Sequence, residues 1–454
     1  MKLPSYPDYI PSGVEYLGKM PSAWQTIPVK REYEVQLGKM LQNEPESDAD
    51  ALVPYLKALH VLWGSVNTAD LPEMWASPTE VRRFGVRRGD LLVCEGGEAG
   101  RAGMLDSAPD PCIIQNAVHR VRGRGADVRY LQYVLHAIGS GGWFGVLCNR
   151  ATIAHLTGEK LAELRIPLPS LPEQRGIAAF LDCETAKLDT LVEKKRALIE
   201  LLKEKRSALI SRTVTRGLPP EAARATGLDP HPKLKPSSVE WIGEVPEHWE
   251  VWELSHAFRR IGSGTTPTSG DWWYYDDGTV PWVTTSELRE AVILDTAAKV
   301  TRAALRDFPA LRVYPKGTLL VAMYGATIAR VGILGIEACV NQACCAFADP
   351  SALDTRFVFY WLQARRREII AFASGGGQPN VNAQVLCALR VPAPPVPEQH
   401  AIADFLDRET AKLDQMAAKV EEAVERLREH RAALITAAVT GKIDVRGADV
   451  RASL

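Results

Sequence analysis

The chain has 454 residues, 46% of them hydrophobic and 24% charged, which is the composition of an ordinary globular protein too long for a single domain. Its formal net charge of −1 argues against a protein that grips a polyanion by charge alone, because non-specific DNA affinity comes mainly from neutralised phosphates. The sequence has no signal-peptide pattern, no apolar run near the roughly 20 residues of a membrane span and no C-x-x-C pair, so we expect a cytoplasmic protein with reduced cysteines.

The first predicted domain covers residues 1–169 and mixes strands with helices. Residues 90–94 and 112–114 have the short apolar runs of strands, and residues 128–138 have helical periodicity. Glycine-rich turns such as residues 95–100 connect such segments. We expect an α+β fold whose loops carry the variable surface.

Polar and basic side chains in this domain are candidates for contact with DNA. Base edges are read by side chains that offer hydrogen-bond donors and acceptors, and phosphates are contacted by basic clusters such as residues 119–124 and the Arg87-Arg88 pair. A turn, a capping hydrogen bond or an ordinary solvated surface is the competing interpretation of each residue. The candidates are Trp63, Ser65, Asn67, Arg101, Gln115, Asn116, Arg120, Arg122, Arg124, Asn149 and Arg150.

Residues 170–216 are predicted to form a spacer helix of roughly 40 residues, about 60 Å long. Apolar residues recur every seven positions with a second set four positions later, where Thr185 also falls, and this spacing predicts a coiled-coil seam. Ser170 and Glu173 have the spacing of a capping box, and Gly217 is placed to end the helix. Lys195 interrupts the seam and is expected to snorkel. The expected pairing residues are Leu181, Leu188, Val192, Ile199, Leu202 and Leu209.

A Pro-, Gly- and Ala-rich linker, residues 217–235, precedes a second copy of the same unit. Residues 166–189 and 391–414 share Pro-Glu-Gln, Phe-Leu-Asp and Glu-Thr-Ala-Lys-Leu-Asp at a separation of 225 residues. Residues 11–24 match 236–249 at the same separation, and each copy ends in a tryptophan, Trp24 or Trp249, that we expect to be a core anchor. The interiors, 25–165 and 250–390, diverge. This pattern indicates a shared scaffold that carries two different reading surfaces.

The second predicted domain, residues 236–394, repeats the mixed pattern of the first. Residues 318–323 resemble a strand and residues 355–372 a helix, again with glycine-rich turns between elements. Its candidates for DNA contact lie in polar loops, with the same competing interpretation of turns and caps. They are Ser263, Thr265, Thr266, Thr284, Thr285, Tyr324, Thr327, Gln342, Gln378 and Asn380.

The last elements are a second spacer helix, residues 395–441, and a tail, residues 442–454. The seam of this helix predicts pairing with the first helix, and an antiparallel arrangement is natural with a globular domain between them. We therefore expect two target-recognition domains joined by two antiparallel coiled-coil helices, with a pseudo-twofold internal repeat. Thr410 falls on the predicted seam, and Gly441 is placed to end the helix. The expected pairing residues are Leu406, Leu413, Val420, Val424, Leu427 and Leu434.

Sequence motifs of catalysis are missing. The chain has no P-loop, and Gly262-Ser-Gly-Thr-Thr-Pro267 has proline where a dinucleotide fingerprint needs its last glycine. The Asn/Asp-Pro-Pro-Tyr/Phe tetrapeptide of amino-methyltransferases does not occur, and the cysteines and histidines lack metal-ligand spacing. We predict no catalytic residue, no metal site and no cofactor bound by this chain.

The duplicated helix motif resembles that of the specificity subunits of type I restriction–modification systems. Further resemblance lies in Gly89-Asp-Leu-Leu-Val93, in Pro281-Trp-Val-Thr284 and in Leu389-Arg-Val-Pro392 leading into the second helix, so that it covers essentially the whole chain. The resemblance implies a non-catalytic subunit that reads double-stranded DNA, each recognition domain reading one half of an asymmetric bipartite target.

The same resemblance implies a set of partners. Two methyltransferase subunits would use S-adenosylmethionine, and two restriction subunits, which would use ATP and Mg, would join them in a restricting complex; no membrane is implied. Two alternatives remain: an enzyme with unrecognised motifs, and a coiled-coil adaptor that binds only other proteins. Activity of the pure chain would favour the first, and unchanged DNA affinity after removal of residues 25–165 or 250–390 would favour the second.

Overall fold

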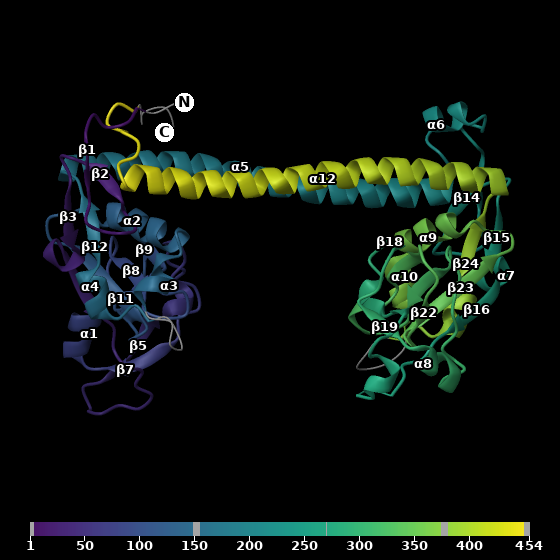
Figure 1. Ribbon diagram of the computed structural model, residues 1–454, viewed down its shortest axis with the longest axis horizontal. Coiled ribbons are helices and arrows are strands. Elements are labelled where there is room, and N and C mark those ends of the chain that lie inside the picture. Colours follow the sequence, from purple (N-terminus) through teal and green to yellow (C-terminus); the bar gives the residue numbers. More distant parts are fainter. Residues whose placement is uncertain (1–3, 149–154, 269, 374–379, 449–454) are drawn as a thin grey trace. The chain divides into compact units, whose positions relative to one another are not determined.

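A computed structural model describes residues 4–148, 155–268, 270–373 and 380–448. The chain divides into two compact units: unit 1 is Met1–Arg196 with Glu421–Leu454, and unit 2 is Ala197–Val420. Each unit contains one globular domain and a part of each long helix, α5 (Leu171–Arg216) and α12 (Val396–Val439) (Figure 1). The predicted α+β fold class is confirmed by sheets and helices in both domains.

The globular domain of unit 1 is built from four sheets with short helices around them. The strands, in sheet order, are β1 (Tyr9–Pro11) and β2 (Lys19–Pro21); β12 (Arg165–Leu168) and β3 (Gln25–Pro28); β4 (Tyr33–Leu37), β11 (Val118–Gly123), β8 (Leu91–Cys94), β9 (Ala102–Met104) and β6 (Gly64–Ser65); and β10 (Ile113–Ile114), β5 (Ala51–Leu56) and β7 (Glu73–Ala76). The helices are η1 (Val29–Arg31), η2 (Ala58–His60), α1 (Pro78–Phe84), α2 (Val128–Ser140), α3 (Trp143–Leu147) and α4 (Gly158–Glu163).

The globular domain of unit 2 repeats these sheets in the same order. Its strands are β13 (Leu234–Pro236) and β14 (Glu244–Pro246); β24 (Arg390–Ala393) and β15 (Glu250–Glu253); β16 (Phe258–Ser263), β23 (Cys344–Pro350), β20 (Leu319–Ala322), β21 (Val331–Leu334) and β18 (Ala291–Ile293); and β22 (Cys339–Val340), β17 (Val280–Val283) and β19 (Ala298–Val300). The helices are α6 (Pro220–Ala225), α7 (Leu254–Ala257), η3 (Trp272–Tyr274), η4 (Thr285–Glu287), α8 (Arg302–Asp307), η5 (Gly325–Thr327), α9 (Thr355–Ala364), α10 (Arg366–Ala371) and α11 (Ala383–Cys387). The repeat detected in the sequence is therefore also a repeat of topology.

Each domain packs its main helix, α2 or α9, against the five-stranded sheet and the long helices. Asp127 and Asp354 cap these two helices, each accepting a bond from a backbone N–H of the first turn. The predicted helix 355–372 is wrong in one respect: α9 ends at Ala364, and α10 begins after Arg365 leaves helical geometry with φ −109° and ψ 17°. Trp24 and Trp249 are buried in the two cores, as predicted.

The long helices lie side by side within each unit. In unit 1, Asp189 of α5 pairs with Arg431 of α12 at 2.9 Å, and in unit 2, Arg206 of α5 pairs with Asp414 of α12 at 3.0 Å. Within unit 1, the start of α5 and the end of α12 contribute to one hydrophobic cluster, so the two segments run antiparallel (Figure 1). The seam leucines Leu181 and Leu406 are fully buried at the globular domains.

One local expectation needs correction, and the structure adds two further details. The capping box at Ser170 does not form among the described residues, because the Glu173 carboxylate instead accepts bonds from Tyr6 (2.7 Å) and Trp24 (3.2 Å). The linker 217–235 is not wholly irregular, since it contains α6, whose Ala223 is buried in the core of unit 2. Thr185, on the predicted seam, also contacts Tyr133 of α2 at 3.4 Å, and Thr410 likewise contacts Tyr360 of α9 at 3.3 Å. No helix in the described ranges combines the length and apolarity that crossing a membrane requires.

Candidate nucleic-acid interface

The repeated Pro-Glu-Gln motif fastens each long helix to its globular domain. Glu398 accepts bonds from Trp249 (3.1 Å) and His248 (2.8 Å) in unit 2, and Glu173 accepts the equivalent tryptophan bond in unit 1. The following glutamine, Gln174 or Gln399, accepts from the backbone N–H of the capping aspartate of α2 or α9 and donates to a proline carbonyl before the long helix. Both copies therefore position the globular domain with the same bonds.

The repeated Leu-Asp and Glu-Thr-Ala positions complete this scaffold. Tyr133 of α2 donates to Asp182 at 2.6 Å and contacts Thr185, and Tyr360 of α9 makes the same bond to Asp407 and the same contact to Thr410. Burial and the carboxylate raise the pKa of Tyr133 to about 12, so the phenol stays protonated and donates. These residues attach the globular domain to the long helix in both copies. We therefore expect the function that is specific to each domain at positions where the two copies differ.

The candidates of unit 2 converge on one edge of its five-stranded sheet. At this edge, hereafter the loop edge, β16 and β20 end and β23 begins. Ser263 ends β16, Thr265 and Thr266 follow it, and Gln342 lies two residues before β23. The remaining described candidates lie in the neighbouring loops: Thr284 and Thr285 follow β17, Tyr324 and Thr327 follow β20, and Asn380 forms a β-bridge with Tyr324.

Hydrogen bonds tie several of these side chains together. Thr266 donates through its hydroxyl to Oε1 of Gln342, and Gln342 also bonds to Tyr324. Burial raises the pKa of Tyr324, so its hydroxyl remains a donor. Thr284 is partly committed to structure, because its hydroxyl shares a bond with Ser286 at 2.8 Å and it lies at the N-cap of η4. The loop edge of unit 2 thus presents amide and hydroxyl groups, the groups that can read base edges.

The loop edge of unit 1 has the same construction with different side chains. There β4 and β8 end and β11 begins, and Gln115 and Asn116 precede β11 as Asn341 and Gln342 precede β23. The backbone of Gln115 bonds to Leu56 (2.9 Å), and both side chains are half-buried without a hydrogen-bond partner among the described residues. Unpaired amides at this edge are available to a ligand that offers donors and acceptors.

The other candidates of unit 1 do not share this environment. Trp63 donates to Glu98 (2.6 Å), and Arg101 holds Glu98 (3.0 Å) and the Ala58 carbonyl, so the two side chains fix the turn at residues 95–101. Ser65 is exposed on the edge strand β6, and Asn67 accepts a bond from the Ala69 backbone. Three candidates lie outside the described residues: Asn149, Arg150 and Gln378.

Three other arginine candidates of unit 1, Arg120, Arg122 and Arg124, lie within β11 or directly after it. Arg120 is buried and donates to the Arg83 and Gly85 carbonyls, so its guanidinium is used by the protein itself. Arg122 makes a two-pronged bond to buried Asp90 at 2.6 and 2.8 Å. Arg124 is exposed and, with Arg122, lines a polar cavity of about 420 Å³ whose other basic residues are Arg87, Arg88 and Arg175. Of these three arginines, Arg124 is the one that the structure leaves exposed.

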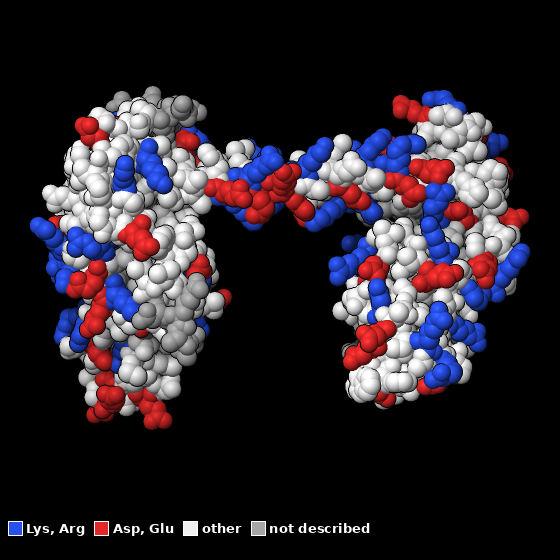
Figure 2. All heavy atoms as spheres, in the orientation of Figure 1, with Lys and Arg blue, Asp and Glu red and all other residues white. Residues whose placement is uncertain are grey.

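Charges of both signs are interspersed over the visible face of each unit, with no broad patch of one sign there (Figure 2). This distribution agrees with the net charge of −1. A surface of this kind supplies little non-specific attraction to phosphates, so recognition depends on particular side chains. The described residues contain no group of three or more His, Cys, Asp or Glu that could hold a metal ion.

Sequence reasoning missed the apolar side chains beside both loop edges. Met40 is 74% exposed just after β4, and Trp272 is 66% exposed on the loop after β16. The available signal was the Trp272-Trp273 pair itself, since two adjacent tryptophans in a glycine- and aspartate-flanked loop cannot both be core residues.

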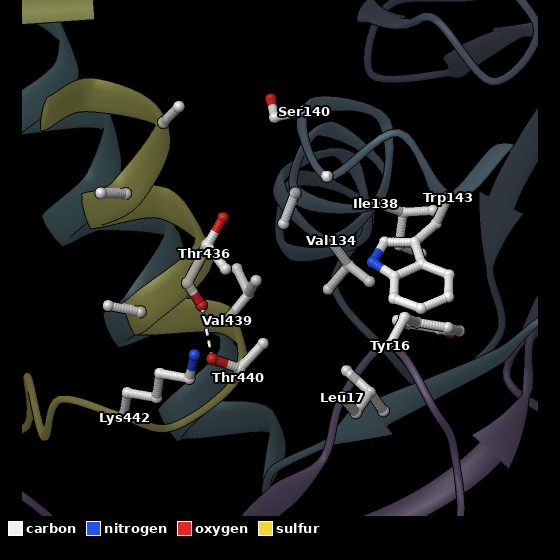
Figure 3. Close-up of a pocket in the computed structure, with 15 residues that line it drawn as sticks. Tyr16, Leu17, Val134, Ile138, Ser140, Trp143, Thr436, Val439, Thr440 and Lys442 are labelled. Carbon is white, nitrogen blue, oxygen red and sulfur yellow. Dashed lines mark hydrogen bonds between the residues drawn. The ribbon is translucent and has the colours of Figure 1, made fainter. Parts of the chain in front are cut away.

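The two units also differ beside the long helices, because unit 1 has a pocket next to α12. An apolar pocket of about 450 Å³ separates α2 from the last turns of α12, with Val134, Trp143 and Thr436 among its lining residues (Figure 3). In unit 2 the position equivalent to Val134 is Trp361, which is fully buried and packs at a tilt of 56° against Trp241, with ring centroids 5.3 Å apart. Trp361 belongs to one hydrophobic cluster with Ile210 and Val214 of α5, the helix that lies there in place of α12.

Comparisons with known proteins agree on one family. A family model described as "Type I restriction modification DNA specificity domain" matches residues 83–201 and 246–426, more than half of the chain. The Type I restriction enzyme MjaVIII specificity subunit of Methanocaldococcus jannaschii is 25% identical over 65% of this chain and 65% of its own length. The Type I restriction enzyme EcoBI specificity subunit of Escherichia coli is 22% identical over 96% of this chain and 90% of its own length.

A solved structure has the same fold. One chain of a structure described as "Structural basis underlying complex assembly and conformational transition of the type I R-M system" matches with a TM-score of 0.65 at 16% identity. The match covers 92% of this chain and 98% of that one. At this identity the likeness concerns the fold, and it extends over both globular domains and both long helices.

Proposed function

The chain belongs to the family of type I restriction–modification DNA specificity subunits, and on that premise we propose that each globular domain reads one half of a bipartite duplex target. Members of this family are non-catalytic DNA-recognition subunits that bind no cofactor themselves and act with methyltransferase and restriction partners. The proposed domains are residues 1–169 and 236–394, the proposed spacer helices are 170–216 and 395–441, and the linker and tail are 217–235 and 442–454.

One observation carries this proposal: the two domains share the tryptophan, glutamine and tyrosine bonds to the long helices but differ in the side chains at the loop edge. Two domains that bound the same ligand would not need two different loop edges on one scaffold. Gln115 and Asn116 in unit 1, and Thr266 and Gln342 in unit 2, are the proposed base readers. Bidentate amide contacts of this kind favour adenine, and each is worth about 1–3 kcal/mol of discrimination.

The proposed role of the long helices is to set the gap between the two half-sites. A paired seam resists bending, and helices lengthen by 1.5 Å per residue. Two methyltransferase subunits, which would carry S-adenosylmethionine, are the proposed partners for modification. Two restriction subunits, which would use ATP and Mg, are the proposed addition for cleavage.

Insertion of one heptad into each helix tests this role. Seven residues add about 10 Å to each helix, which corresponds to about three base pairs of duplex. The insertions belong at the middle of each helix, after Lys194 in α5 and after Lys419 in α12, away from the bonds that fasten the globular domains. We expect the gap in the methylated motif to lengthen while both half-sites keep their bases, as read by single-molecule methylation mapping of cells that express the subunit with its methyltransferase.

The matched control inserts the same heptad only in the linker after Asp229, which should change neither the bases nor the gap. Altered half-site bases with an unchanged gap would contradict the proposal. Methylation that continues at the same sites after removal of residues 25–165 or 250–390 would instead indicate an adaptor that binds only proteins.

A further inference from the structure

We propose that Trp272 and Trp273 contact the target duplex by stacking on its bases, beside the polar readers of unit 2; this inference rests on the function proposed above. The two indoles are 66% and 54% exposed, although tryptophan is a side chain that proteins usually keep largely covered. Adjacent exposed apolar side chains mark interaction sites, and apolar side chains that enter a duplex stack at a base step that they unstack.

The loop that carries the pair is fixed by its other residues. Tyr275 donates to the Pro267 carbonyl at 2.7 Å and packs on Trp282, whose indole N–H donates to Thr265. Tyr274 packs edge-on against Phe308 at 5.1 Å. Of four consecutive aromatic residues, the two tyrosines therefore anchor the loop and the two tryptophans face solvent.

The backbone of the pair is held as well. The Trp273 carbonyl accepts a bond from the Thr301 hydroxyl at 3.1 Å, and Asp271 caps the short helix η3. The indole rings lie 6.0 Å apart and nearly perpendicular, at 85°. A fixed pair loses little conformational freedom on binding, and perpendicular rings can offer one face and one edge to a ligand, but not two faces to a single base step.

The loop is continuous with the proposed base-reading residues. Pro267 follows Thr266 directly, and Thr266 is the partner of Gln342. Gly264 lets the chain pass over the end of β22, since a Cβ at this position would collide with the Val340 carbonyl. A duplex read by Thr266 and Gln342 therefore lies within reach of the next residues of the loop.

Unit 1 has an independent instance of the same arrangement. Gly38 passes over the end of β10 as Gly264 passes over β22, and a Cβ there would collide with the Gln115 backbone. Two residues later, Met40 is 74% exposed and Leu41 is 47% exposed. Methionine and leucine are side chains that DNA-bending proteins insert between base steps. Both loop edges thus place exposed apolar groups next to their polar readers.

The charges of the loop indicate that the two tryptophans contact bases and not phosphates. From Gly264 to Leu288 the sequence has no Lys or Arg, while Asp271, Asp276 and Asp277 flank the tryptophans. The loop therefore cannot gain affinity by neutralising phosphates, whereas stacking does not require a positive charge. The contribution of the tryptophans to affinity should therefore be nearly independent of salt concentration.

The experiment uses the full subunit assembled with its methyltransferase subunits, and a duplex containing the target found by methylation mapping. Trp272→Ala with Trp273→Ala should weaken binding at least about tenfold, by the same factor at 50 and 200 mM salt. Trp272→Phe with Trp273→Phe should recover most of the affinity, because phenylalanine also stacks. Indole fluorescence of the wild-type complex should fall on adding duplex, and the fall should be smaller in the alanine variant.

The matched control is Leu294→Ala, which removes another exposed apolar side chain, 72% exposed, from the end of β18 in the same unit, and it should leave affinity unchanged. Unchanged affinity of an assembled alanine variant overturns the inference. So does failure of that variant to assemble with the methyltransferase, because the pair would then be a protein-docking surface. A wild-type complex that does not bind the duplex at all overturns the proposed function itself.

Discussion

The two globular domains share their sheet topology and several equivalent hydrogen bonds, yet they differ in the side chains that are free to contact a ligand. Glu173 and Glu398 hold equivalent tryptophans, and Asp182 and Asp407 hold equivalent tyrosines, in bonds that match within a few tenths of an ångström. The loop edges differ instead: that of unit 1 carries amides without a hydrogen-bond partner, and that of unit 2 carries a bonded threonine–glutamine–tyrosine group.

This difference shows which positions the scaffold constrains. A buried polar group that loses its partner costs about 1–3 kcal/mol, so the helix motif tolerates little change. A loop side chain that contacts only solvent carries no such cost, so the two loop edges can differ while the fold remains the same. Interior positions that differ between the units, such as Val134 and Trp361, are constrained less than the helix motif and more than the loop edges.

The interior difference can be tested by exchanging the two side chains. Trp361→Val should open in unit 2 the space that is a pocket in unit 1 and lower the local free energy of opening by about 2–3 kcal/mol. The cost is at the low end for a buried tryptophan, because the Trp361 indole N–H has no partner among the described groups. Hydrogen exchange of α9 measures the effect, since a chain of two units need not unfold in one step.

The reverse change, Val134→Trp in unit 1, should be tolerated, because its side chain can enter the existing pocket of about 450 Å³. If Val134→Trp lowered the hydrogen-exchange protection of α2 as much as Trp361→Val lowers that of α9, the two helices would not occupy equivalent environments.

A smaller effect is expected from His136, which unit 2 replaces by Gln363. Burial and, next, the charge of Arg431 at 3.3 Å lower the pKa of His136 to about 4 from its ordinary value of 6.5. The unfolded histidine therefore takes up a proton first as pH falls. The stability that the neutral ring confers is complete above pH 6.5 and is lost between pH 6.5 and 4, about 2 kcal/mol of it by pH 5.

Hydrogen exchange of α2, corrected for intrinsic rates, should show this loss between pH 7 and 5. His136→Gln should abolish the loss and leave α2 as insensitive to pH as α9, whose Gln363 makes the same arginine contact at 3.5 Å. An undiminished pH response in the glutamine variant would assign the effect to another group.

The sequence predicted the parts of the fold that repeat. The separation of 225 residues and the heptad spacing were sufficient for two α+β domains and two long helices, and they located Trp24 and Trp249 in the cores. The break at Arg365 and the helix α6 in the linker were missed, because both depend on tertiary packing rather than on local periodicity. Glu173 was assigned to a capping box because its partner, Trp24, is distant in sequence.

The candidate site was only partly predictable. The candidates of unit 2 were found as polar loops, and they converge because the ends of β16 and β20 meet the start of β23 at one edge of the sheet. Arg120 could not be distinguished from an exposed arginine by sequence, since its partners are backbone carbonyls of residues 83 and 85. The exposed tryptophans were overlooked because apolar residues are by default assigned to the core.

The most direct test of the central claim is methylation mapping of cells that carry changes at one loop edge at a time. Thr266→Ala with Gln342→Ala should relax the bases of one half-site only, and Gln115→Ala with Asn116→Ala should relax those of the other, with the gap unchanged in both strains. If either pair of changes altered both half-sites, or neither pair altered any, the assignment of one reading edge to each domain would be wrong.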